Sequence, residues 1–336
     1  MKQRATLAFL LLSPYLCSTH GFAQNLRSTQ DSAAPVFHIS SDLVLVDVEA
    51  ISSADGHPIN TLKRNDFRIL DNGQPVSIKT FDTGEATRTL ALWFVVQCNM
   101  RGWEAQGSGL FAGQVERFQP ALLNLDKRDR VAVAHWCDDG QSQVDLPPTT
   151  NIEQTVTTLE GALAPQPDKP SHGRSGELAL QKTLQHIVNS TRLMPSERVP
   201  VIVFLHGDYS AMPRPEANQF IGELLATSAI AFGLRDSRSP RILSIGISGE
   251  QGSIGNYIAK QTGGEYFSVK PETYASGLNQ ILEQLHARSE LGFAPSVLDG
   301  KRHKLQVTLT DHRMIPSKSV RLRYRAAYVA MPPASR

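Results

Sequence analysis

The sequence predicts an α/β protein: a doubly wound, mainly parallel, Rossmann-like sheet flanked by β-rich segments at both ends. Two apolar runs, at 90–96 and 199–205, are continuous, as in strands buried on both faces. Stretches with helical spacing of apolar residues separate such runs. Before residue 87 and after residue 290, apolar and polar residues alternate instead, which is typical of strands with one face in solvent.

Residues 1–23 have the pattern of a secretory signal. Lys2 and Arg4 precede an apolar run at 7–12 that is too short to span a bilayer. Small residues stand at Gly21 and Ala23, before an expected cut after Ala23. We expect a secreted or periplasmic protein with no transmembrane segment, beginning with a flexible tail at 24–35.

The composition excludes several classes of protein. The chain has 336 residues, with 34 Lys and Arg against 32 Asp and Glu, and both leader cations fall before the expected cut. The remainder is neutral, which argues against binding nucleic acid. A hydrophobic content of 40% is typical of folded proteins, and three cysteines are too few for a disulfide scaffold.

The N-terminal β-rich segment covers 36–86. A strand is predicted at 43–48, and a hairpin joins strands at 67–70 and 76–81 around Asp71-Asn72-Gly73. These few strands make a thin sheet that needs something to pack against. We therefore hypothesise that they pack with the C-terminal β segment, 291–330, whose predicted strands are 304–310 and 320–329.

The central segment, 87–290, alternates strands with helices. Two stretches, 229–234 and 242–247, are both strand-like, and the sequence does not decide which one joins the main sheet. The other predicted strands are 90–96, 131–134, 199–205 and 266–269, and the predicted helices are 115–125, 152–163, 178–188, 216–226, 254–261 and 274–288.

The order of several motifs resembles the bacterial secreted proteins with a von Willebrand factor type A-related domain (VWFA or VWA domain). The resemblance covers about residues 37–329 and implies a doubly wound sheet and a binding role rather than catalysis. The motifs are Asp55-Gly56, Asn65-Asp66-Phe67, Asp71 to Pro75, Thr262 to Glu265, Leu285 to Phe293 and Asp299 to Leu305.

A-type domains usually bind ligands through a divalent cation at a metal-ion-dependent adhesion site (MIDAS), and the resemblance implies that this site is degenerate here. Gln97 takes the aspartate position of the Asp-x-Ser-x-Ser motif, and Asn99 and Arg101 take the two serine positions. Arg101 repels a cation, and His206, in the loop after the later strand, is a poor ligand for Mg²⁺. The loop at 175–177 has no threonine. We expect no Mg²⁺ and no other cofactor.

Two residues of the same loops leave alternatives open. Arg101 either pairs with a carboxylate, from Asp208, Asp138 or Asp139, or lies exposed on its loop. Trp103 is either an exposed contact anchor at the binding edge or a buried lid on the core.

The A-type order also makes the strands that end near Cys98 and Cys137 parallel neighbours. Their spacing is within disulfide reach, and the expected compartment permits oxidation. The alternative is two buried free thiols.

Catalysis is the third choice. His135, His206, Asp138, Asp208 and Ser210 fall near one sheet end, but no hydrolase elbow, zinc-protease, P-loop or dinucleotide motif is present. We expect a noncatalytic, exported protein that binds a protein or a cell-surface ligand through loops 97–109, 137–142 and 206–212. The alternative is a structural component of a cell-envelope assembly.

Overall fold

The chain is described by a computed structural model, in which residues 42–336 form one compact unit. The chain builds two parts. The first four strands and the last four strands form one part, and the elements between them form the other. The described residues are 43–83, 89–98, 118–137, 139–163, 175–194, 198–205, 214–236, 254–270, 273–310 and 319–332.

The central part is a six-stranded sheet. Its order is β10-β9-β8-β5-β6-β7, in which the first five strands are parallel and β7 is an antiparallel edge strand. The predicted α/β class is therefore confirmed. The strands are β5 (Thr89–Cys98), β6 (Arg130–Cys137), β7 (Ser142–Thr149), β8 (Arg198–Leu205), β9 (Ile230–Asp236) and β10 (Tyr266–Val269).

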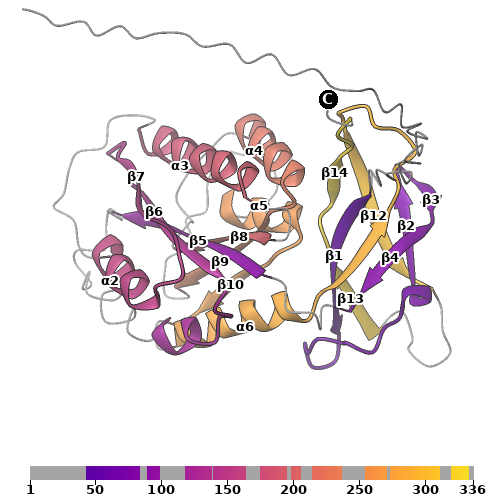
Figure 1. Cartoon of the computed structure of the whole chain (residues 1–336), viewed down its shortest axis with the longest axis horizontal. Helices are drawn as coiled ribbons and strands as arrows, with labels where there is room; N and C mark the ends of the chain where they lie inside the picture. Colours follow the sequence, from indigo (N-terminus) through magenta and orange to yellow (C-terminus); the bar gives the residue numbers. More distant parts are fainter. Residues whose placement is uncertain are drawn as a thin grey trace, which may run out of the picture. The chain divides into compact units, whose positions relative to one another are not determined.

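Helices cover both faces of this sheet (Figure 1). On one face lie α3 (Ser175–Arg192), α4 (Arg214–Ala226) and α5 (Ile254–Thr262); on the other lie α2 (Ile152–Leu163), α6 (Tyr274–His286) and the helical residues 118–122.

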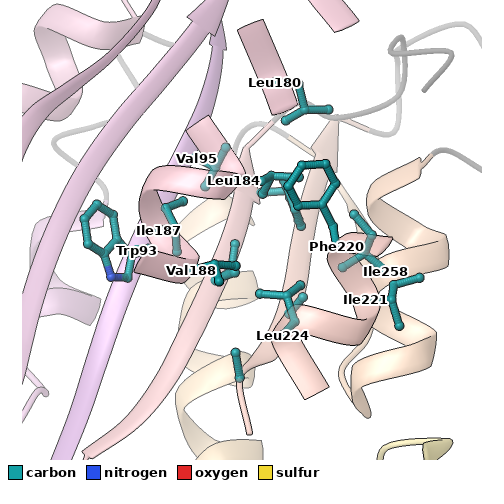
Figure 2. Close-up of a cluster of buried hydrophobic side chains, with 14 of the residues drawn as sticks. Trp93, Val95, Leu180, Leu184, Ile187, Val188, Phe220, Ile221, Leu224 and Ile258 are labelled. Atoms are coloured by element: carbon teal, nitrogen blue, oxygen red, sulfur yellow. The ribbon is translucent and has the colours of Figure 1, made fainter. Parts of the chain in front are cut away.

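Strand β5 is apolar on both sides because each side faces a separate core. Leu92 and Phe94 belong to the cluster beneath α2 and α6, whereas Trp93 and Val95 belong to the cluster beneath α3, α4 and α5. Figure 2 shows the second cluster, in which Leu184 of α3 lies among side chains of α4 and α5. This two-sided burial explains the continuous apolar run in the sequence.

Strands from the two ends of the chain form a β-sandwich. One sheet has the order β13-β1-β11-β4 and the other β14-β12-β2-β3, with a shared core that includes Ile69, Leu291 and Tyr328. The strands are β1 (Val44–Ser52), β2 (Phe67–Asp71), β3 (Gln74–Val76), β4 (Ile78–Asp82), β11 (Ser289–Phe293), β12 (Arg302–Leu309), β13 (Val320–Arg323) and β14 (Ala327–Val329). The predicted domain boundary at 290/291 falls inside β11.

Two predicted strands were wrong in the same way. The stretches 76–81 and 320–329 each divide into two short strands that belong to different sheets, β3 and β4 in one case and β13 and β14 in the other. Alternation continues through each break because the two sheets share one core, so periodicity does not reveal that the chain changes sheets. The hairpin turn at Asn72-Gly73 is confirmed, with φ of 49° and 85° at these two residues.

The structure also shows which of the two strand-like stretches, 229–234 or 242–247, supplies a strand of the central sheet. Residues 230–236 form β9, between β8 and β10 in the central sheet, and 242–247 lie outside the described residues. The predicted leader and tail, 1–35, lie outside them as well. In the part of the chain that the structure describes, no helix is both long and apolar enough to cross a membrane.

Candidate binding edge of the central sheet

The carboxyl ends of the parallel strands mark the candidate site. Strands β5, β6 and β8 are parallel neighbours, so Cys98, Cys137 and Leu205 end their strands at the same edge. In open α/β sheets this edge is where ligands bind. It is called the binding edge below.

Gln97 is the one residue of the predicted degenerate metal site whose side chain the structure describes. Gln97 is 3% exposed, and its backbone pairs in register with that of Trp136 in β6. By alternation along β5 its side chain points to the same face as Trp93 and Val95, beneath α3. A buried, neutral amide thus stands where a metal-binding A-type domain is expected to have a carboxylate.

Two cysteines stand in register at the binding edge next to Gln97. Cys137 is 2% exposed and disulfide-bonded. In the parallel register of β5 and β6, its backbone lies opposite that of Cys98. Neighbouring strands are about 4.8 Å apart, which is within disulfide reach. The register places the two residues of the predicted disulfide side by side, and their pairing stays a prediction.

The turn after β6 packs against the start of α3. Gly140 donates from its backbone N–H to the carbonyl of Cys137 (3.0 Å) and has φ of 98°. Asp139 accepts from the N–H of Gln141 (3.0 Å). A Cβ on Gly140 would lie 3.2 Å from the Cβ of Ser175, the first residue of α3. This turn is therefore fixed by a positive φ and by close contact with a helix.

Polar contacts hold the β6–β7 hairpin to the same helix. Thr183 of α3 lies 2.9 Å from the Ser142 hydroxyl and donates to its own helix carbonyl at Ala179 (3.1 Å). On β6, the Nδ1 of His135 lies 2.7 Å from a carboxylate oxygen of Asp145. Because a carboxylate only accepts, Nδ1 carries a proton in this contact. The orientation of the His135 ring is thus fixed by the Asp145 carboxylate.

The remaining predicted site residues lie outside the described residues: Asn99, Arg101, Trp103, His206 and Asp208, with Asp138 and Ser210. Within the described stretches, no group of three or more His, Cys, Asp or Glu side chains is arranged to hold a metal ion. The described part of the binding edge holds a buried neutral amide, hydroxyls and a disulfide-bonded cysteine.

A second polar cluster, around Arg288, was not predicted from the sequence. Arg288, the last residue of a predicted helix, is 1% exposed and lies 3.5 Å from Glu49 of β1, also 1% exposed. It donates to the carbonyl of Gly263 (2.6 Å) and lies 5.6 Å from the ring centre of Phe232. Arg323 of β13 reaches both Glu49, at 3.6 Å, and Glu265.

Burial dominates the electrostatics of this cluster. Desolvation raises the pKa of Glu49 above its usual range, although the two arginines beside it act in the opposite direction. Arg325, two residues after Arg323, donates to the carbonyl of Leu45 and to that of Leu225 (3.3 Å for Leu225). Burial lowers the pKa of Arg325. These contacts join the sandwich strands to α4 and the loop after α5.

The glycines of the Thr262-Gly263-Gly264 motif allow the sandwich strands to approach the loop after α5 closely. Gly263 has φ of 87°, as expected for a helix C-terminus, and a Cβ there would lie 2.6 Å from the backbone nitrogen of Arg325. A Cβ on Gly264 would lie 1.8 Å from the carbonyl oxygen of Ala231 in β9. The motif therefore marks a place where three backbone segments approach closely.

No protein-family model and no curated protein matches the chain. Solved structures similar to it include an aerotolerance-related membrane protein from Bacteroides fragilis, with 16% identity, a TM-score of 0.41, and coverage of 58% of this chain and 98% of that one. Another is a von Willebrand factor type A protein from Catenulispora acidiphila (11% identity, TM-score 0.41, 79% of this chain and 74% of that one). A third is BatB from Bacteroides thetaiotaomicron (15%, 0.40, 58% and 98%).

The central part of the chain is a doubly wound α/β domain with an antiparallel edge strand. The solved structures that are similar to the chain include von Willebrand factor type A domains. At these identities the likeness concerns the fold alone.

Proposed function

We propose that the protein is a noncatalytic, exported binding protein that captures a protein or a cell-surface ligand at the binding edge without a metal ion. The loops that would make the contact are 97–109, 137–142 and 206–212. The observation that carries the proposal is the buried Gln97 at the position of a metal-binding aspartate, beside the disulfide-bonded Cys137.

The chemistry of these two residues supports recognition without a cation. A neutral amide adds no negative charge for Mg²⁺, which prefers oxygen ligands with net negative charge nearby. A disulfide between Cys98 and Cys137 would cross-link the ends of two neighbouring strands without an ion. Such a cross-link would fix the distance between the two strands from which two of the contact loops start.

A structural role in an envelope assembly is the second candidate. One observation favours it: Val297 and Met331, at one end of the sandwich, are 54% and 57% exposed. Their segments are joined, since Gly300 donates to the carbonyl of Ala330 (2.7 Å). An assembly contact at this end would remove the apolar surface of these two side chains from water.

Site-specific photocrosslinking in the producing cell separates the two candidates. A photoreactive amino acid is placed at position 103 or 141 for the binding edge, and at 297 or 331 for the sandwich end. Position 193 is the matched control, since Leu193 is 87% exposed and lies beyond the opposite end of α3 from Ser175. Crosslinks from 103 and 141 alone support the proposal, and crosslinks from 297 and 331 alone support assembly. Crosslinks from neither pair contradict both.

Calorimetry tests metal independence. Residues 24–336 are titrated with Mg²⁺, Mn²⁺ and Ca²⁺, and we expect no saturable heat with any of them. Micromolar one-to-one binding that is lost in Asn99→Ala would overturn this part of the proposal and point to recognition of an acidic group through a bridging cation.

A further inference from the structure

Strand β12 presents cations on the outer face of the sandwich. It lies between β14 and β2 in its sheet (Figure 1). Most of its inward side chains are buried, and one of them, His303, lies 3.0 Å from Asp71 of β2. Arg302 and Lys304, at the alternate positions, are exposed and therefore point outward. Arg68, an exposed outward residue of β2, continues the same face, because β2 and β12 are antiparallel neighbours.

The outward positions of these two described strands hold no carboxylate. Arg302 donates to Oε1 of Gln261 in α5 (2.9 Å), which is a neutral partner. The backbone of Lys304 is bound twice by Asn72: its carbonyl accepts from the Asn72 N–H, and its N–H donates to the Asn72 side chain, both at 2.9 Å. The outward residues are Arg68 and Leu70 in β2 and Arg302, Lys304, Gln306 and Thr308 in β12.

Two exposed apolar side chains lie in the segments that flank the start of β12. Val297 and Met331 are 54% and 57% exposed. The N–H of Ala330 donates to the carbonyl of Lys301 (3.0 Å), so the two segments are joined next to these side chains. The side chain of Lys301 is itself 80% exposed. This patch is named the cationic corner and consists of Val297, Lys301, Arg302, Lys304 and Met331.

Asp299 is an acid in the same turn. Its carboxylate is 29% exposed, accepts from the backbone N–H of Lys301 (2.9 Å) and lies 3.2 Å from Nε2 of His303. The Lys301 ammonium is 4.0 Å away from it. Set against three exposed cations, this one partly buried carboxylate leaves the cationic corner with a positive charge.

We propose that the cationic corner docks the protein onto the anionic surface of a lipid bilayer. Its cations contact the headgroup phosphates, while Val297 and Met331 enter the boundary between the headgroups and the acyl chains. Attachment of this kind combines electrostatic attraction with burial of apolar surface, and the corner offers both side by side. An acidic protein would satisfy the cations alone, whereas a bilayer also takes up the two apolar side chains. None of these residues belongs to the binding edge, so docking goes beyond the proposed function.

Co-sedimentation with vesicles measures docking. Residues 24–336 contain the whole compact unit and lack the apolar run at 7–12, which would itself enter a bilayer. With vesicles of equal parts phosphatidylglycerol and phosphatidylcholine, we expect saturable binding at low salt. About 1 M sodium chloride, at which the Debye length is about 3 Å, should remove most of this binding. Equal binding to vesicles of phosphatidylcholine alone would overturn the proposal.

A triple variant, Lys301→Gln, Arg302→Gln and Lys304→Gln, tests the cations. Each cation near an anionic bilayer contributes about fivefold to the affinity, so binding should weaken about a hundredfold. The changed side chains are all exposed, and an unchanged melting temperature would show that the variant is folded. Binding within about threefold of the wild type would contradict docking through this corner.

The matched control removes the same charge elsewhere on the surface. Lys127, Lys182 and Lys270 are exposed and lie in the central domain, outside the corner, and all three are changed to glutamine. Screening limits their effect at about 0.1 M salt, so binding should weaken by no more than about threefold. A loss equal to that of the first triple variant would mean that only net charge matters, and the proposal would fail.

The apolar side chains are tested separately. Val297→Ser with Met331→Ser should weaken vesicle binding by about tenfold, because less apolar surface then leaves water. Leu193→Ser is the control, since Leu193 is 87% exposed outside the corner, and it should bind as the wild type does. In the photocrosslinking experiment above, one protein captured from both 297 and 331 would overturn docking and favour an assembly contact at this end.

Discussion

Replacing Arg288 by methionine tests whether the buried ion cluster stabilises the fold. The substitution keeps much of the volume but removes a guanidinium that is 1% exposed, with its contacts to Glu49 and to the carbonyl of Gly263. Glu49 keeps Arg323 as a partner, at 3.6 Å.

The expected loss of stability is large. Removing one member of a buried pair typically destabilises a protein by about 3–5 kcal/mol, and here Glu49 loses the more deeply buried of its two arginine partners. The unfolding free energy of a whole domain is about 5–15 kcal/mol, so this single change would remove a large part of it. Adding Glu49→Gln removes the stranded carboxylate, and the double variant should be more stable than Arg288→Met by at least about 1 kcal/mol.

The pH dependence follows from the raised pKa of Glu49. A carboxyl group whose pKa is higher in the folded than in the unfolded protein stabilises the fold below the unfolded value, and this contribution is lost as the pH rises through the folded value. Removing Arg288 removes an effect that lowers this pKa, so the pKa of Glu49 rises further. The deficit of Arg288→Met should therefore grow from pH 5 to pH 8, by no more than about 1.4 kcal/mol per pH unit for one proton.

Urea denaturation followed by tryptophan fluorescence measures these differences, because Trp93 and Trp136 are buried in the central domain. The wild type, both single variants and the double variant are compared at pH 5, 6.5 and 8. The reasoning is wrong if Arg288→Met loses less than about 1 kcal/mol at pH 8, or if its deficit is the same at all three pH values.

Three further predictions concern other parts of the fold. Cys137→Ser should lower the unfolding free energy by about 3–4 kcal/mol, since a disulfide to Cys98 would close a loop of roughly 40 residues; an unaffected Cys98→Ser would show that the partner is another cysteine. Gly264→Ala should abolish soluble expression, because its Cβ would overlap the carbonyl of Ala231, whereas Gly161→Ala, in open space within α2, should raise the melting temperature slightly. Treatment with EDTA should leave the melting temperature of residues 24–336 unchanged, and a fall of several degrees would indicate a stabilising metal ion.

The sequence predicted the central domain well because periodicity reports burial directly. The bounds of α2 and β10 agree with the prediction at both ends. Strand β7 was missed because Pro147 and Pro148 argue against a strand. Proline is tolerated there because β7 is an edge strand with register shifts against β6.

The polar clusters were harder to predict from the chain. Nothing in the sequence around Arg288 distinguishes it from a surface cation, since its partner Glu49 lies 239 positions away. The same holds for His303 and Asp71, whose motifs were noted only as family features. For the binding edge, the position of Gln97 and the register of Cys98 with Cys137 followed from the expected strand order, because backbone pairing needs no knowledge of side-chain contacts.

The arrangement of the sandwich has a consequence for how the protein folds. Asp71 and His303 are in contact across 232 positions, with the whole central domain between them. During synthesis or export, β1 to β4 emerge long before β11 to β14, so their apolar faces stay uncovered while the central domain can already collapse on its own local contacts. The apolar faces of the first strands are thus covered only when the last strands arrive. A chain that stops before β12 should therefore aggregate or be cleaved by proteases rather than work as a shorter protein.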